Sequence, residues 1–102
     1  MSVVKINAIS VPAEAGPELE RRFAARAHTV DASPGFLGFQ LLRPVAGDDR
    51  YFVVTHWADD ASYELWRDGD ARAAHKGEQG TPVASGANLL EFEVVMDVKP
   101  SA

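Results

Sequence analysis

The sequence predicts an α+β fold whose elements follow in the order β-α-β-β-α-β, the ferredoxin-like arrangement. Four segments are rich in Val, Ile, Leu and Phe and are bounded by Pro, Gly or Asp, as strands are. One stretch between them carries apolar residues at helical spacing, and another is bounded by a helix cap and a helix stop. The length of 102 residues suits one domain, residues 1–102, with a single core.

The first strand is expected over residues 3–11, where Val and Ile are frequent, and Pro12 ends it. Gly16 and Pro17 then suit the N-cap and the first helical position. One apolar stripe of this helix recurs at helical spacing, namely Leu19, Phe23, Ala27 and Val30. The run Ser33-Pro34-Gly35 is expected to stop the helix.

The second and third strands are expected over residues 36–45 and 51–57, joined by a hairpin-like turn at residues 46–49. Asp59 can cap a short helix over residues 61–68, which Gly69 ends. Asp70 can cap a further helix over residues 71–78, so the second helix is predicted to be broken in two. A long final strand is expected over residues 89–98.

The predicted strands are apolar on both sides. In the first, Val4, Ile6 and Ala8 alternate with Val3 and Ile9. Because two helices can cover only one face of the sheet, the other face is expected to meet a second sheet. We therefore predict a homodimer with the sheets face to face, a dimeric α+β barrel. A monomer that exposes some apolar surface is the alternative.

Composition excludes several functional classes. The net charge of −5 and the pI near 5.0 disfavour nucleic acid and anionic membranes as partners. No cysteine is present, which excludes disulfides, thiolate catalysis and iron–sulfur clusters. No apolar run is long enough to span a bilayer, and the first residues show no signal-peptide pattern, so we expect a cytoplasmic protein.

Three side chains are the candidates for chemistry: Asn7, Trp66 and His75. Nine residues of unbroken helix turn through about 900°, which would place residues 66 and 75 on opposite sides. The break at Gly69 and Asp70 lets both face one pocket. Small residues around His75 would admit a large flat ligand, and neutral imidazole is a good axial ligand for haem iron. An amide, an indole and an imidazole around one pocket suit iron protoporphyrin.

Each candidate also has an ordinary structural interpretation. His75 could face solvent, Trp66 could be a core anchor, and the Asn7 amide could satisfy itself at a bulge. His56 and His28 are rival histidines, the first more typical of a core or interface and the second of a surface. Arg22 and Arg26 flank Phe23, and these arginines could bind haem propionates or could form a solvated face paired with Glu18 and Glu20.

These residues resemble the IsdG-like haem-degrading monooxygenases of the antibiotic-biosynthesis-monooxygenase superfamily, and in particular the mycobacterial branch, the MhuD type. The trio Asn7, Trp66 and His75 falls where the family pattern has it. Nearly the whole chain is covered, through the stretches VVKINAI (3–9), SPGFLGFQLLRP (33–44), RYFVVTHW (50–57) and LLEFEVV (89–95).

The resemblance implies a haem pocket between helices and sheet in each subunit of a dimer. Haem b would be both substrate and cofactor, with His75 on the iron and Asn7 donating a hydrogen bond on the distal side. Trp66 would press on the porphyrin and keep it ruffled, which favours oxidation of a meso carbon. O2 and an external electron donor, a reductase or small reductant, would be needed. The products would be iron and an opened, mycobilin-like tetrapyrrole.

The sequence departs from the MhuD type mainly through polar residues near the pocket, namely Tyr63, Asp68, Arg72, Lys76, Glu78 and Gln79. These polar residues affect the expected haem affinity and the expected product, and they leave Asn7, Trp66 and His75 unchanged. Three other functions stay open. The chain could be a non-catalytic haem carrier, a cofactor-free quinone-forming monooxygenase of the same superfamily, or a small barrel with a structural or stress role.

Overall fold

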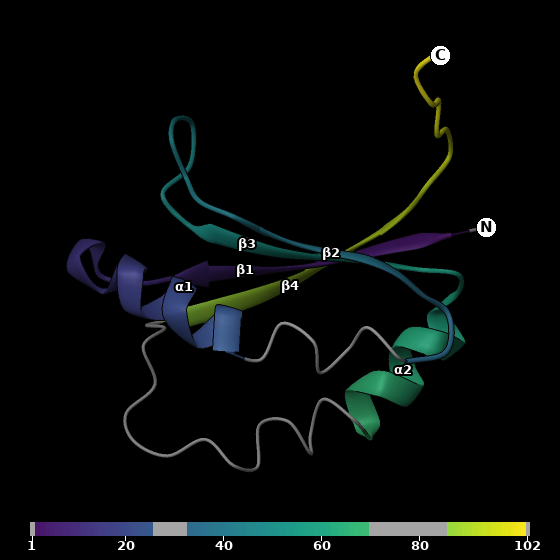
Figure 1. Ribbon diagram of the computed structural model, residues 1–102, viewed down its shortest axis with the longest axis horizontal. Coiled ribbons are helices and arrows are strands. Elements are labelled where there is room, and N and C mark those ends of the chain that lie inside the picture. Colours follow the sequence, from purple (N-terminus) through teal and green to yellow (C-terminus); the bar gives the residue numbers. More distant parts are fainter. Residues whose placement is uncertain (1, 26–32, 70–85, 102) are drawn as a thin grey trace.

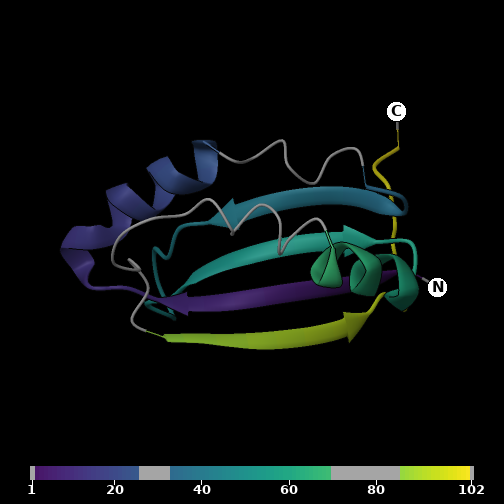
Figure 2. The ribbon, with the colours of Figure 1, turned by 90° about the horizontal axis from the view of Figure 1, so that it is seen from below.

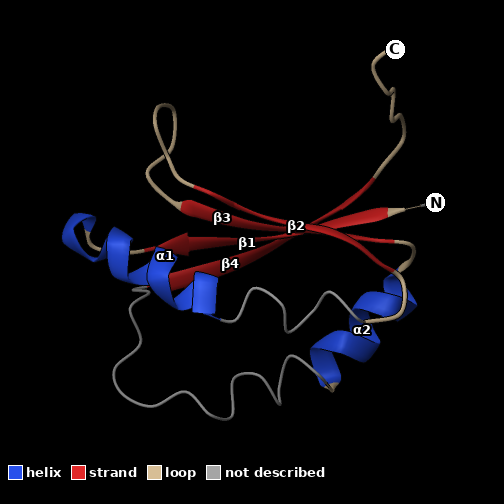
Figure 3. Cartoon of the chain, viewed as in Figure 1, coloured by secondary structure: helices blue, strands red, loops and turns tan. Residues whose placement is uncertain are grey.

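A computed structural model describes residues 2–25, 33–69 and 86–101, and shows the expected β-α-β-β-α-β order over them. The four strands form one antiparallel sheet in the order β2-β3-β1-β4. Both helices lie on the same side of this sheet (Figures 1 and 3). The elements are β1 (Val3–Ser10), the 3-10 turn η1 (Ala13–Ala15), α1 (Gly16–Ala25), β2 (Phe36–Leu42), β3 (Tyr51–Trp57), α2 (Asp60–Asp68) and β4 (Gly86–Glu93).

The alternation of β1 decides which side chains meet the helices. Successive strand residues point to opposite faces, so the odd-numbered positions of β1 share one face. Val3 packs in a buried cluster with Trp57 and with Tyr63 of α2. At the other end of the strand, Ile9 packs in a second cluster with Leu19 and Tyr51. The odd-numbered face is therefore the helix-covered face, with one small core under each helix.

Helical structure begins earlier than predicted at the first helix. Gly16 was expected to be the N-cap, but its φ and ψ of −54° and −51° are helical, and η1 precedes it. The Ala15 amide donates to the Pro12 carbonyl at 2.9 Å, so the turn starts directly after the proline. Gly16 is required there for space, because a Cβ would lie 2.7 Å from the hydroxyl of Tyr51. The predicted end of this helical stripe, at Ala27 and Val30, lies outside the described residues.

The connection into β2 depends on a second glycine. Gly35 has a φ of +78°, and a Cβ there would collide with the Ser62 hydroxyl of α2. Its carbonyl accepts from the Ala58 amide at 2.8 Å, which ties this turn to the residue after β3. The predicted stop at Ser33-Pro34-Gly35 is thus a tight turn packed against the start of α2.

Four predicted strand ends differ from the structure, the smallest being that of β1, which ends at Ser10 rather than at residue 11. β2 ends at Leu42 rather than at residue 45, since Pro44 cannot donate to a ladder and Val45 is 94% exposed. β4 runs over Gly86–Glu93 rather than 89–98. Its pairing with β1 starts at Gly86, opposite Ser10, and ends at Glu93, opposite Val3. One further backbone bond follows, from the Val94 amide to the Ser2 carbonyl at 3.0 Å, and the apolar Val95 and Met96 lie outside the sheet.

The short helix α2 has the predicted cap and stop, and it begins at Asp60, one residue before the predicted start. The Asp59 carboxylate accepts from the Ser62 amide at 2.8 Å and caps its first turn. Gly69 follows its last residue, and the Gly69 amide donates to the Leu65 carbonyl at 3.0 Å. The second half of the predicted broken helix, residues 71–78, lies outside the described residues. None of the described helices is long and apolar enough to cross a membrane.

The face of the sheet away from the helices is apolar, as the sequence predicted. The register places Ile6, Val54 and Leu90 side by side on it, with Phe92 near one end. Phe92 is 52% exposed and Leu42 of β2 is 44% exposed. The β2–β3 connection and the C-terminal segment rise on this side in Figure 1, where no described helix covers the strands.

Candidate functional site

The candidate site is the part of the helix-covered face between the two helices. Figure 2 looks onto this face and shows α1 and α2 near opposite ends of the sheet. The middle of β1 crosses the space between them with Lys5 and Asn7, both at odd-numbered positions.

Asn7 lies on the helix-covered face and is exposed. It is in continuous register with Val53 of β3 and Leu89 of β4, so no bulge interrupts the strand at this point. This rules out a bulge as the way in which the amide satisfies itself. The side-chain amide instead projects from a regular sheet between the apolar Val53 and Leu89, where a ligand can reach it.

Trp66 combines the two interpretations that the sequence left open. Its ring packs against Trp57, with centroids 5.5 Å apart, and against Tyr63 at 6.2 Å. The side chain is nevertheless only half-buried. Within the described part of the chain, its buried Nε1 has no hydrogen-bond partner. The indole is therefore held by the core on one side and still presents surface on the other.

Phe23 provides an aromatic wall under α1. It packs against the cluster of Ile9, Leu19 and Tyr51, and its ring stacks on Phe39 of β2 with centroids 6.3 Å apart. On the same helix Arg22 forms an ion pair with Glu18, Nε to Oε1 at 3.0 Å, with 34% of its side chain exposed. The pairing of these charges was one of the two predicted roles for Arg22.

Beside this wall, between α1 and the edge strand β2, lies an open hollow of about 470 Å3. Its polar side is a cluster in which Arg43 donates from Nε to Glu20 at 2.8 Å and the Tyr51 hydroxyl also donates to Glu20. The hydrogen bond from Arg43, and then that from Tyr51, lowers the pKa of Glu20 to about 2. The remaining lining is apolar and comprises Phe23, Ala24, Phe39 and Leu41.

We expect the Glu20 carboxyl to titrate near pH 2 in an NMR pH series, against an ordinary value of 4.5. A carboxyl with a lowered folded-state pKa stabilises the fold above its unfolded-state pKa, and this contribution is lost as the pH falls through about 2. Arg43→Met should return the midpoint toward its ordinary value. Arg21→Met is the matched control, because Arg21 pairs with Glu18. A Glu20 titration midpoint near the ordinary value of 4.5 in the native protein would contradict the hydrogen bonds from Arg43 and Tyr51 to Glu20.

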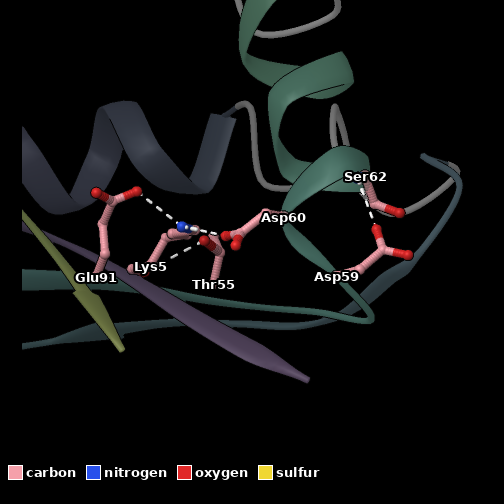
Figure 4. A network of polar contacts seen from close by, with 6 residues as sticks. All are labelled: Lys5, Thr55, Asp59, Asp60, Ser62 and Glu91. Carbon is pink, nitrogen blue, oxygen red and sulfur yellow. Dashed lines mark hydrogen bonds and ion pairs between the residues drawn. The ribbon is translucent and has the colours of Figure 1, made fainter. Parts of the chain in front are cut away.

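Lys5 is a residue that the sequence interpretation missed. Its Nζ donates to Asp60 of α2 at 2.6 Å and to Glu91 of β4 at 2.7 Å, as Figure 4 shows. Thr55 Oγ1 donates to the Lys5 carbonyl at 3.2 Å. Burial would lower the pKa of Lys5, but the hydrogen bonds and charges of the two carboxylates outweigh it and raise that pKa above 10.5. A lysine alternating with Asn7 in an apolar strand was the signal available.

Four of the six predicted site residues lie on elements of one side of the sheet: Asn7 on β1, Phe23 and Arg22 on α1, and Trp66 on α2. The other two, His75 and Arg26, lie outside the described residues, as does the rival His28. The third histidine, His56, is in register with Val4 on the opposite face of the sheet.

The fold and the sequence together place the chain in a family. A model of the antibiotic biosynthesis monooxygenase family matches residues 2–77, so the chain belongs to that family. A heme oxygenase (mycobilin-producing) of Mycobacterium tuberculosis strain H37Rv is 69% identical over 98 residues, which are 96% of this chain and 93% of the relative. The predicted ferredoxin-like fold of this family is confirmed.

Solved structures agree with this placement. The structure of the heme-degrader MhuD from Mycobacterium tuberculosis with two hemes bound in its active site has 69% identity and a TM-score of 0.90, covering 95% of this chain and 99% of that one. The cofactor-independent oxygenase SnoaB from Streptomyces nogalater is 21% identical with a TM-score of 0.68 over 97% of this chain and 98% of its own. That second likeness shows the fold alone.

Proposed function

We propose that this protein is a haem-degrading monooxygenase that opens the porphyrin ring at a meso carbon and releases iron. The observation that carries the proposal is the 69% identity over 98 residues with a mycobilin-producing heme oxygenase. By the same relation we propose a mycobilin-like product. O2 and an external electron donor complete the reaction.

The described residues fit a porphyrin. A porphyrin is a wide apolar plane with two carboxylates at one edge, and it needs flat walls and cations at a rim. Trp66 and Phe23 supply aromatic surfaces from the two helices, each backed by a buried cluster. Asn7 supplies an exposed amide on the sheet between them. Nε1 of Trp66, buried without a partner among the described residues, is a donor that bound ligand atoms or water could satisfy.

Each residue has one role in this proposal. His75 would hold the haem through its imidazole on the iron, and Asn7 would donate a hydrogen bond to the bound ligand from its side-chain amide. Trp66 presses on the ring and resists its flattening, since Trp57 and Tyr63 hold the indole from behind. Arg22 and Arg26 meet the propionates, for which Arg22 would share its guanidinium with Glu18. When bound, haem supplies the site of O2 activation and the carbon that is oxidised.

Haem titration followed by turnover tests the function. Without oxygen, hemin should shift the Soret band and saturate. After air and ascorbate or a reductase are admitted, the band should disappear, ferrous iron should be released, and mass spectrometry should detect an opened tetrapyrrole. A ferric or ferrous–oxy complex that persists under these conditions would instead identify a haem carrier. Absence of any Soret shift would exclude both.

Asn7→Ala is expected to keep haem binding and slow oxygenation. The variant removes one hydrogen-bond donor from an exposed position, so the fold should lose little. Loss of one preorganised donor to a reacting group typically lowers kcat by roughly 10²-fold. Stopped-flow decay of the Soret band measures the rate, and Asn88→Ala is the matched control, because Asn88 lies opposite Ala8 on the other face of the sheet. Equal rates for Asn7→Ala and the native protein would remove Asn7 from the mechanism.

We also propose that the protein is a homodimer that buries the uncovered face of the sheet. The apolar Ile6, Leu90 and Phe92 lie on this face, and Phe92 is 52% exposed. A stable interface buries roughly 800 Å2 per partner. Phe92→Asp should shift the protein from dimer to monomer in analytical ultracentrifugation, whereas the exposed Leu65→Asp on α2 should not. A native monomer at micromolar concentration would contradict this proposal.

A further inference from the structure

Lys5 joins three elements through a single ammonium group. Its side chain is 7% exposed, while the carboxylates that it contacts are 61% exposed at Asp60 and 56% at Glu91. One partner is the first residue of α2 and the other lies on β4, so this cation fastens the start of the helix to two neighbouring strands. Figure 4 shows Lys5 pointing between these two carboxylates.

The residues of α2 that face Lys5 form a line that leads to Trp66. Asp60, Tyr63 and Trp66 are spaced three apart, so they follow one side of the helix. Lys5 contacts the first two: it forms the ion pair with Asp60, and its Nζ lies 5.1 Å from the centroid of the Tyr63 ring. Tyr63 in turn lies against Trp66, with ring centroids 6.2 Å apart. The position of the indole therefore depends on where this helix begins.

Lys5 also links the position of Trp66 to that of Asn7 on the sheet. Lys5 and Asn7 are two residues apart on β1 and point to the same face. The path from the amide to the indole thus runs along β1 to Lys5, across the ion pair to Asp60, and along about two turns of helix. Apart from this cation, α2 is held to the strands mainly by Tyr63 and Trp66 against Trp57.

We propose that Lys5 is a positioning residue that sets the place of Trp66 relative to Asn7, and so the fit of the porphyrin between them. This inference rests on the proposed function for its ligand. It extends the site to a residue that touches neither the iron nor the ring. Because Trp66 is fixed through the helix, loss of the cation should loosen the indole without removing it.

Fluorescence of the haem-free protein tests the coupling directly. The chain has two tryptophans, so a Trp57→Phe background leaves Trp66 as the sole tryptophan, and excitation at the red edge of the absorption band avoids the two tyrosines. In this background we expect Lys5→Met to red-shift the emission and increase acrylamide quenching. Methionine keeps the buried stem, and the exposed Asp60 and Glu91 stay hydrated, so no buried charge is left without a partner. Lys5→Arg should restore the native spectrum, since guanidinium can bridge both carboxylates.

Two amide variants separate positioning from general stability. Asp60→Asn breaks the ion pair to α2, and Glu91→Gln breaks the matched pair to β4. We expect Asp60→Asn to reproduce the Lys5→Met emission and Glu91→Gln to resemble the native protein. In otherwise native, haem-loaded enzyme, Lys5→Met should lower turnover by roughly 10- to 100-fold and change the ratio of product isomers, since a displacement of about 1 Å can cost 10²-fold.

Native Trp66 emission in Lys5→Met would overturn the inference, as would equal effects of Asp60→Asn and Glu91→Gln. If Lys5→Met does not fold, Lys5→Arg and the two amide variants decide the question. Failure of the native protein to bind hemin would remove the proposed function. The fluorescence of the haem-free variants would still establish or overturn the coupling of Lys5 to Trp66.

Discussion

His75→Ala is expected to abolish haem turnover and to weaken haem binding. Imidazole is the one side chain of the proposed trio that can coordinate iron, so its removal leaves the metal without a protein ligand. We expect the hemin dissociation constant to rise by more than roughly tenfold, which corresponds to about 1.4 kcal/mol. Titration at the Soret band measures binding, and mass spectrometry of the pigment after addition of reductant measures turnover.

His56→Gln is the matched control for this variant. His56 lies in β3 in register with Val4, on the face of the sheet away from the helices. It should keep the native Soret band and native turnover. Added imidazole should restore part of the haem spectrum of His75→Ala, because it can occupy the coordination position. Full activity of His75→Ala would show that the ligand assignment is wrong.

The sequence was most informative where local pattern and tertiary role coincide. β3 and α2 were predicted with correct or nearly correct ends, because β3 is a short β-branched and aromatic run and α2 has both a cap and a stop. The uncovered apolar face followed from residues such as Ile6 and Leu90, which are apolar at positions that helices cannot reach. Phe23 and Trp66 lie on the helix-covered side because they belong to the two predicted helices.

The sequence was least informative where distant residues decide the outcome. The end of β4 follows from its pairing with β1, which stops at Val3 opposite Glu93, and the lack of space for a side chain at Gly16 comes from the Tyr51 hydroxyl. Lys5 finds its partners 55 and 86 residues away along the chain. A lysine in an apolar strand signals that some partner exists. Only the folded arrangement shows that the partner is the start of the helix that carries Trp66.

Trp57→Ala is expected to have the largest effect on stability. Trp57 is the largest fully buried side chain among the described residues, with 0% exposure. Its ring contacts Phe36, Tyr63 and Trp66, with centroids 5.6, 5.9 and 5.5 Å away. Truncation of a core tryptophan costs about 3–5 kcal/mol, a large share of the roughly 5–15 kcal/mol that stabilises a domain. Calorimetry should show a Tm lower by roughly 15–30 °C.

Trp57→Phe separates packing from hydrogen bonding at this position. In the described structure Nε1 of Trp57 is buried without a hydrogen-bond partner, so phenylalanine removes an unsatisfied donor together with part of the ring. We therefore expect a much smaller loss of Tm than in Trp57→Ala. A loss as large as that of the alanine variant would contradict this expectation. Because Trp57 supports Trp66 from behind, Trp57→Ala should also loosen the indole that faces the proposed pocket. Trp57→Phe should keep haem binding, so the two variants test whether the core at this end of the sheet is also the support of the site.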